Sequence, residues 1–227
     1  MESCGWAAVT DAMQRYHDEE WCVPSYDDRE LFELLMLEAL QCGLSWRLII
    51  DRREAIRTAL AGFDFERLAA FTPEDEAAAL AVPGMLRSPR KMAAMVKNAR
   101  AFVGMRQEFG SFDSWLWRFT DGRVLVYRGH EAEFPAENAL SGRIAKALKK
   151  RGFAYLGAVT VYSFLQAAGV INDHGAACPL RAKILASCAW REEDDDWEGQ
   201  KDICCRKINA DEKAAVREKT LRRIRNA

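Results

Sequence analysis

The chain has 227 residues, of which 49% are hydrophobic, so it can form one large domain with a substantial core. Its formal net charge of -1 gives no general reason to expect a polyanionic partner, and its seven cysteines lack the dense spacing of a secreted disulfide scaffold. The sequence shows no leader pattern and no apolar run of membrane-spanning length. We therefore expect a soluble, intracellular protein that does not bind membranes.

Residues 1–24 show no clear periodicity, and we expect an irregular segment there. A helix is predicted next, from a cap at Ser25 to about Cys42, with Gly43 as its stop. Glu38 falls on the apolar face of this helix, where a carboxylate is costly to bury unless it is paired or binds a ligand. Two interpretations of Glu38 stay open, namely an ion pair within the core and a ligand-binding acid.

Aromatic residues and one amide lie near Glu38 in the sequence. They are Trp6, Tyr16, Trp21, Gln41 and Trp46. Aromatic faces combined with one acceptor and one amide suit a flat, hydrogen-bonding ligand such as a purine. The alternative is an ordinary aromatic core, which the residue types do not exclude.

The next part of the chain is predicted to be almost wholly helical. Expected helices cover about residues 45–60, 64–71, 72–81, 88–105, 111–119, 141–151 and 156–168. Pro73 and Pro89 each follow a capping residue, as proline commonly does at a helix start. Residues 124–127 are typical of a short strand, but no partner strand is evident. The fold class is therefore all-α.

A tight turn with Pro83 and Gly84 separates two of these helices, so residues 82–91 form a predicted hairpin. Residues 86–106 contain no acid, and three bases follow the turn, namely Arg87, Arg90 and Lys91. Amides at the turn and at the next helix start can bind a phosphate, and the bases can contact neighbouring phosphates. The hairpin suits a DNA backbone, although helix pairs of this kind occur in many α-domains.

Two pairs of residues are candidate metal ligands. His174 and Cys178 are four residues apart, and Cys4 is close to His17 in the sequence. Two Cys and two His complete a tetrahedral zinc shell without an open position, which is typical of a structural site. Long connections separate the pairs, so buried thiols beside hydrogen-bonded histidines are the alternative.

The character of the chain changes after about Ala186, so we predict a domain over residues 1–185 and a charged extension over 186–227. Residues 192–198 include six acids, and Cys204-Cys205 follows them. An acidic block can shield a basic face, but such runs are more often simply solvated. The sequence indicates no role for the extension.

Several short motifs occur in a fixed order along the chain. They are Cys4-Gly5-Trp6, Tyr16-His17-Asp18, Glu20-Trp21, Val23-Pro24, Leu31-Phe32-Glu33, Leu37-Glu38, Gln41 with Gly43-Leu44-Ser45-Trp46, Arg53-Glu54, Asn98-Ala99-Arg100-Ala101, Leu148-Lys149-Lys150-Arg151-Gly152-Phe153, and Asn172-Asp173-His174 with Cys178. In order and spacing they resemble the DNA-3-methyladenine glycosylase I family over about residues 1–180.

The resemblance implies a helix-hairpin-helix glycosylase fold that binds DNA through the hairpin at residues 82–91. The implied DNA-binding residues are Gly84, Arg87, Arg90 and Lys91. The implied ligands of one structural zinc ion are Cys4, His17, His174 and Cys178. In the implied base pocket Glu38 and Tyr16 hydrogen-bond the methylated adenine and Trp46 stacks on it, with Trp6, Trp21 and Gln41 around them.

The implied activity is that of a monofunctional glycosylase of bacterial base excision repair, working as a cytoplasmic monomer on double-stranded alkylated DNA. It would flip 3-methyladenine out of the helix and hydrolyse its glycosidic bond. Methylation at N3 makes the base cationic, so a carboxylate between aromatic walls favours it over neutral adenine. Residues 86–107 contain no acid, so no Asp base follows the hairpin. Glu38 is the expected catalytic residue, acting through base recognition and transition-state stabilisation.

Two other functions stay open. One is a non-catalytic damaged-DNA or nucleobase-binding protein on the same scaffold. The other is a thiol redox or metal sensor that uses Cys204-Cys205 and the cysteines of the metal cluster. The sequence does not indicate which lesions other than 3-methyladenine would be accepted.

Overall fold

The computed structural model describes residues 4–130 and 132–194. Its first elements are η1 (Ala7–Val9, a 3-10 helix), α1 (Asp11–Glu19), α2 (Asp28–Gln41), α3 (Trp46–Asp51), α4 (Arg53–Ala59), η2 (Ala61–Phe63), α5 (Phe65–Ala69) and α6 (Pro73–Ala81). The others are α7 (Pro89–Phe109), α8 (Phe112–Leu116), η3 (Trp117–Thr120), β1 (Val124–Tyr127), α9 (Ala139–Lys150), α10 (Ala158–Ala167), α11 (Pro179–Ser187) and β2 (Trp190–Glu193). Among these described residues, no helix combines the length and apolarity needed to span a membrane.

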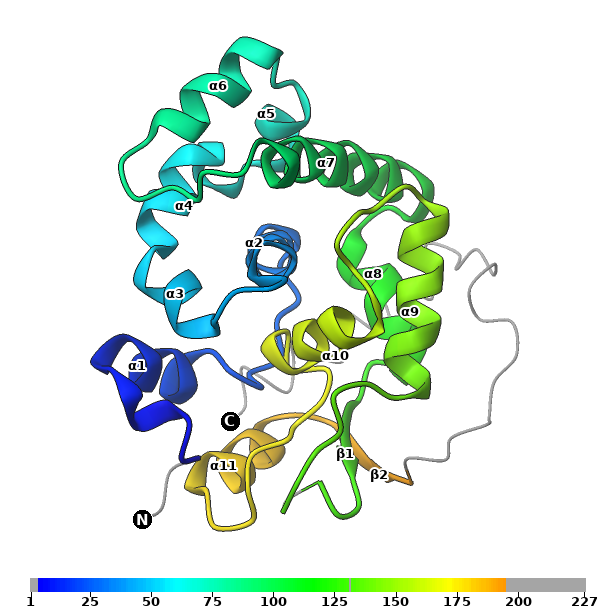
Figure 1. Ribbon diagram of the computed structural model, residues 1–227. Helices are drawn as coiled ribbons and strands as arrows, with labels where there is room; N and C mark the ends of the chain where they lie inside the picture. Colours follow the sequence, from blue (N-terminus) through cyan, green and yellow to red (C-terminus); the bar gives the residue numbers. More distant parts are fainter. Residues whose placement is uncertain (1–3, 131, 195–227) are drawn as a thin grey trace.

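Helix α2 is the centre of the fold, and Figure 1 shows it nearly end-on with other helices around it. Every residue from Leu31 to Leu40 is buried, including the two acids Glu33 and Glu38. A helix that is buried on all sides belongs in the middle of a domain rather than on its surface. Asp27 caps the helix, because its carboxylate accepts hydrogen bonds from the backbone amides of Arg29 and Glu30. The predicted cap at Ser25 was therefore two residues too early.

Most of the predicted helix starts are confirmed. Ser45, Asp64, Thr72 and Ser88 each cap a helix through their side chains. Other predictions are wrong. Residues 1–24 are not irregular, because Thr10 caps α1. The helix predicted over 45–60 divides at Arg52 into α3 and α4.

The strand β1 has a partner that the sequence did not reveal. It pairs in parallel with β2, so that Val124 lies opposite Trp190 and Tyr127 opposite Glu193. On its other side Leu125 forms an isolated parallel bridge with Ile171. Residues 190–193 thus pack on the domain although they follow the predicted boundary at residue 185. The rest of the extension, with Cys204-Cys205, lies outside the described residues.

The chain segment before α2 is bound to the end of α10. The amide of Ser25 donates to the carbonyl of Ala168 over 3.1 Å. Gly169 has φ +67°, and a Cβ atom there would lie 2.3 Å from the backbone nitrogen of Pro24. Only glycine fits that position, because it has no Cβ atom and adopts positive φ readily. The contact places the N-terminal segment beside residues 170–178.

Candidate functional site

Glu38 lies in the last turns of α2, and its side chain is buried. Within the part of the chain that the structure describes, no group forms a hydrogen bond or ion pair with its carboxyl. Burial raises the pKa of Glu38 to about 8, so most of the carboxyl is protonated at neutral pH. The core ion pair that the sequence left open is therefore not formed by the described residues. A buried acid without a partner is characteristic of a ligand-binding position.

The predicted aromatic residues come together beside Glu38, although they belong to separate segments. The ring centroid of Tyr16 lies 5.2 Å from that of Trp46 and 6.3 Å from that of Trp6. Trp21 meets Trp6 almost perpendicularly, with 5.0 Å between centroids. Burial, and after it the nearby Glu38 carboxyl, raise the pKa of Tyr16 well above its ordinary value. Its hydroxyl therefore stays protonated and can donate a hydrogen bond.

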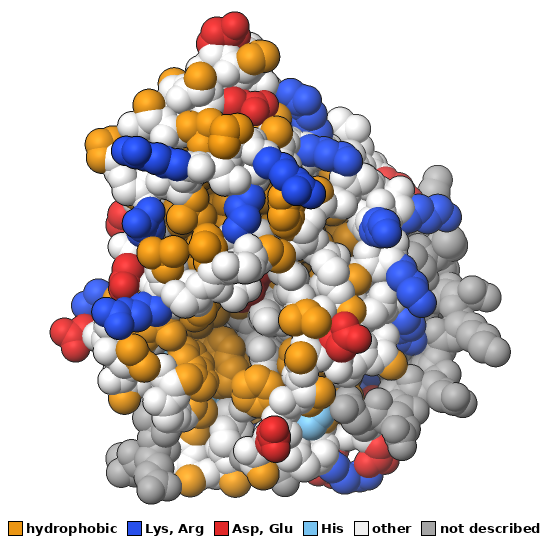
Figure 2. Space-filling model, viewed as in Figure 1, with side chains coloured by type: hydrophobic (Ala, Val, Ile, Leu, Met, Phe, Trp, Pro, Cys, Tyr) orange, Lys and Arg blue, Asp and Glu red, His pale blue; other side chains and the backbone are white. Residues whose placement is uncertain are grey.

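This aromatic group borders an open part of the surface. Figure 2 shows a hollow lined mainly by hydrophobic side chains, in the region where α1, α2, α3 and α10 meet in Figure 1. Trp6 and Trp46 are half-buried, whereas Tyr16 and Trp21 are buried. A recess with aromatic walls and one unpaired acid suits a flat ligand that carries hydrogen-bond donors or positive charge.

Gln41, the predicted amide of the site, has a partner within the protein. Its Nε2 donates to the carbonyl of Leu44 over 2.8 Å, and this bond stabilises the loop between α2 and α3. That loop leads directly to Trp46 at the start of α3. Gln41 thus supports the position of the aromatic wall.

The predicted hairpin connects α6 to α7. The amide of Met85 donates to the carbonyl of Val82, and Gly84 between them has φ +87°. Arg87 and Arg90 are exposed, as a phosphate-binding role requires. Figure 2 shows several basic side chains on this upper part of the front face. Lys91, in contrast, directs its ammonium group into the protein.

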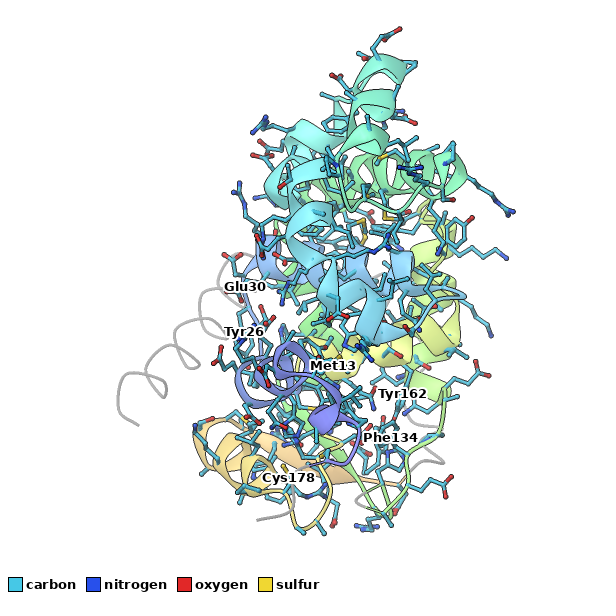
Figure 3. The ribbon with its side chains drawn as sticks, turned by 60° about the vertical axis from the view of Figure 1, so that its left-hand side comes forward. Met13, Tyr26, Glu30, Phe134, Tyr162 and Cys178 are labelled. Carbon is cyan, nitrogen blue, oxygen red and sulfur yellow. The ribbon has the colours of Figure 1, made fainter. Side chains whose placement is uncertain are left out.

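The four predicted metal ligands lie close together, and their ligand atoms are all within 4.8 Å of one another. Sγ of Cys178 lies 3.4 Å from Nδ1 of His174 and 3.8 Å from Nε2 of His17. Sγ of Cys4 lies 3.7 Å from the same Nδ1 atom of His174. Figure 3 shows Cys178 in the lower part of the molecule, below the N-terminal helix that carries Met13. These four residues can hold one metal ion.

Each histidine of this cluster is oriented by a second partner that the sequence analysis did not identify. Nδ1 of His17 lies 2.7 Å from a carboxylate oxygen of Asp18, and Nε2 of His174 lies 3.2 Å from the carbonyl of Trp21. Such contacts fix the ring nitrogen that faces a metal. Burial, and next the neighbouring His17, lower the pKa of His174 to about 4, so its ring is neutral and able to bind metal.

A buried polar network supports the segment that carries His174. The carboxylate of Asp173 accepts hydrogen bonds from Tyr162 at 2.7 Å and Gln166 at 2.8 Å, and it lies 3.1 Å from Nδ1 of His130. The sequence signal for this network was the polar run 172–174 after an apolar helix. Tyr162 and Gln166 belong to that helix, α10, whereas His130 follows β1. The network fixes the backbone beside the metal cluster.

Comparison with known proteins gives consistent matches. The family model described as methyladenine glycosylase matches residues 6–182. DNA-3-methyladenine glycosylase 1 of Escherichia coli (strain K12) is 38% identical over 179 residues, which is 78% of this chain and 96% of that protein. The DNA-3-methyladenine glycosylase of Haemophilus influenzae is 35% identical over 179 residues, which is 78% of this chain and 97% of that protein.

Solved structures agree with these relatives. A crystal structure of 3-methyladenine DNA glycosylase I has a TM-score of 0.74 and 39% identity, covering 78% of this chain and 98% of that one. A structure of the enzyme from Staphylococcus aureus, described as the structural basis of 3-methyladenine recognition, has a TM-score of 0.76 and 33% identity. It covers 80% of this chain and 97% of that one. Strand β2 lies outside the region that the family model matches.

Proposed function

The chain belongs to the methyladenine glycosylase family and is a hydrolase of N-glycosyl bonds, and we propose that it excises 3-methyladenine from alkylated double-stranded DNA. The observation that carries this proposal is Glu38, a buried acid that has no partner among the described residues and lies beside the rings of Tyr16 and Trp46. Two relatives support the substrate, because one has been solved in complex with 3-methyladenine and another in a study of its recognition.

The recess selects the damaged base by its charge. In DNA, adenine methylated at N3 is cationic, and ordinary adenine is neutral. The cation stabilises the ionised form of Glu38, whereas neutral adenine leaves the carboxyl in an environment that favours protonation. Trp46 offers a face on which the base stacks, and the hydroxyl of Tyr16 donates a hydrogen bond to its edge.

Hydrolysis then relies on the substrate more than on a general base. The base must leave the duplex before its glycosidic bond becomes accessible, and the aromatic walls compensate for the lost stacking. A cationic adenine is already a good leaving group, and the anionic Glu38 holds it while water attacks the sugar. As the glycosidic bond breaks, the base leaves as a neutral molecule and positive charge develops on the sugar. Glu38 is proposed to stabilise the transition state through the attraction between its negative charge and this developing charge.

The hairpin holds the DNA while the base is extruded. We propose that residues 82–91 form a helix-hairpin-helix grip, with the backbone at Gly84 and the start of α7 facing a phosphate. Arg87 and Arg90 are exposed there and add charge to neighbouring phosphates. These contacts position the duplex and carry no sequence information.

The cluster of Cys4, His17, His174 and Cys178 is proposed to hold a structural zinc ion. Two thiolates and two neutral imidazoles are ligands that zinc prefers, and tetrahedral zinc would separate neighbouring sulfur and nitrogen ligand atoms by about 3.6 Å. The sulfur–nitrogen distances of 3.4, 3.7 and 3.8 Å are close to this separation. Four protein ligands leave no open position, so the ion would supply stability rather than chemistry.

The proposal is tested by base release from methylated duplex DNA. We expect the zinc-loaded protein to release 3-methyladenine and to leave abasic sites without strand breaks. Glu38→Gln should lose this release while remaining folded, whereas Glu54→Gln, which removes an exposed acid from α4, should retain it. Tight binding of alkylated duplex without any release would instead select the non-catalytic binding protein.

A further inference from the structure

Lys91, in the first turns of α7, has an unusual position for a base that follows a DNA-binding hairpin. Its Nζ donates hydrogen bonds to the carbonyl of Leu40 over 2.6 Å and to the carbonyl of Cys42 over 2.7 Å. The side chain is half-buried, and burial lowers its pKa. Two charge-assisted bonds to the backbone hold the ammonium away from the DNA-facing surface.

The two acceptors are at the C-terminal end of α2, where carbonyl groups have no partner within the helix. A cation at this end also interacts favourably with the helix dipole. Usually such groups are satisfied by the residues that follow the helix. In this protein the donor comes instead from α7, which begins directly after the hairpin.

The segment fixed by these bonds borders the base recess. Residues 41–46 connect α2 to α3, and they end at Trp46, the ring that faces Tyr16. Gln41 holds the same segment from within through its bond to Leu44. Any shift of the carbonyls at the end of α2 would therefore move the stacking wall of the recess.

A second link joins the same two regions. Sγ of Cys42 donates to the carbonyl of Tyr155 at 3.4 Å. The guanidinium of Arg90, next to Lys91, lies over the Tyr155 ring at 5.8 Å from its centroid. The beginning of α7 and the end of α2 thus contact each other directly and also through the loop after α9.

We propose that Lys91 is a positioning residue that couples the hairpin to the base recess, by holding the end of α2 so that Trp46 is in place. This inference rests on the proposed function and assigns Lys91 a role other than phosphate binding. The contact between the hairpin and the duplex then depends on the same short stretch of α7 as the shape of the recess.

The experiment compares Lys91→Met with Lys97→Met. Both variants remove one positive charge from α7, but Lys97 is exposed and lies six residues further along the helix than Lys91. The probe is free 3-methyladenine, which has no phosphate, and its binding is followed by tryptophan fluorescence or calorimetry. We expect Lys91→Met to weaken this binding about tenfold, because a displaced wall loses its alignment with the base. Lys97→Met should bind the free base as the wild type does.

Salt dependence of DNA binding separates the two roles of Lys91. If it positions the recess, Lys91→Met should keep the wild-type slope of affinity against salt concentration, and Lys91→Arg should recover much of the free-base affinity. A phosphate ligand would instead lower the slope by about 0.9 and leave free-base binding unchanged, which would overturn the inference. Thermal unfolding of each variant verifies that binding is measured on folded protein.

The result for the wild-type protein distinguishes a failure of this inference from a failure of the proposed function. A wild-type protein that neither binds 3-methyladenine nor releases it from DNA would overturn both. A wild type that binds and releases the base, together with a Lys91→Met variant of equal free-base affinity, would overturn the positioning role alone.

Discussion

At the scale of single residues, the recognition role proposed for Glu38 has a cost in stability. A carboxyl in water has a pKa near 4, whereas burial raises the pKa of Glu38 to about 8. Between about pH 4 and pH 8, the folded chain therefore holds a proton that the unfolded chain releases. A core residue of similar size without charge would avoid this cost, but it could not attract a cationic base.

The first prediction concerns the pH dependence of excision. Only the ionised carboxylate attracts the cationic base, so kcat/KM should rise with pH and reach a plateau above about pH 8, the pKa of Glu38 in the free protein. Glu38→Gln should lower kcat/KM and remove this rise. The measurement is single-turnover release of 3-methyladenine from duplex DNA between about pH 6 and pH 9. A wild-type profile that falls over this range would contradict the role of Glu38.

The second prediction concerns the stability of the same variant. Because the folded-state pKa is raised, the stabilising contribution of Glu38 is fully present below about pH 4 and is lost as pH rises through about 8. Gln does not ionise, so Glu38→Gln should become more stable than the wild type as pH rises, by up to about 5 kcal/mol at high pH. Thermal unfolding of both proteins at a series of pH values measures this difference in stability. Equal stability at every pH would show that Glu38 is not buried as described.

The structure brings many of the predicted site residues together, whereas their partners within the protein were not predicted. The cluster of Cys4, His17, His174 and Cys178 does come together, although the chain between His17 and His174 is long. That prediction rested on the order of the motifs along the chain. The inward direction of Lys91 and the internal bond of Gln41 could not be predicted, because their acceptors are backbone groups whose positions depend on tertiary packing.

At the scale of the elements, capping residues were the most reliable signal. Side-chain caps are local, so Thr72 and Ser88 located the starts of α6 and α7 correctly. Helix α1 was missed because its polar sequence lacks a long apolar stripe, and its burial comes from contacts with other segments. The partner of β1 was missed because parallel pairing joins residues that are far apart in the chain.

The third prediction tests the close contact at the end of α10. Gly169→Ala should destabilise the fold by roughly 3 kcal/mol or more, because its Cβ atom would collide with the backbone of Val23 and Pro24. The matched control is Gly142→Ala in α9, where a Cβ atom meets nothing within 4 Å. Alanine there should be neutral or stabilise by about 0.5–1 kcal/mol. Denaturant unfolding of both variants gives the comparison, and equal stability would contradict the close contact.

At the scale of the whole molecule, the fold is closed by contacts between distant parts of the chain. Cys4 and His174 are 170 positions apart, and Cys178 and His17 are 161 apart. In addition, β2 pairs with β1 beyond the region that the family model matches. The division of the chain near residue 185 stays a prediction, since residues 190–193 pack on the domain and those from 195 are not described.

The fourth prediction is that metal removal loosens the N-terminal segment. A chelator should lower Tm and weaken base release together, because the segment with the ligand His17 also carries Tyr16 of the recess. Added zinc should restore both properties. Cys178→Ser should resemble the chelated protein, whereas Cys188→Ser, outside the cluster, should retain bound zinc. Metal analysis and thermal unfolding measure these effects, and an unchanged Tm after complete metal removal would contradict the structural role.

The separation of the metal ligands along the chain also orders events during synthesis. Residues 1–24 leave the ribosome early, but the partners of Cys4 and His17 are made only after α10 is complete. The recess around Tyr16 is therefore among the last parts of the molecule to be finished. A growing chain that already has its basic hairpin has no completed recess in which to hold a base. On the proposed function, a chain truncated before residue 174 would lack two of the four ligands, and we expect it to release no base from DNA.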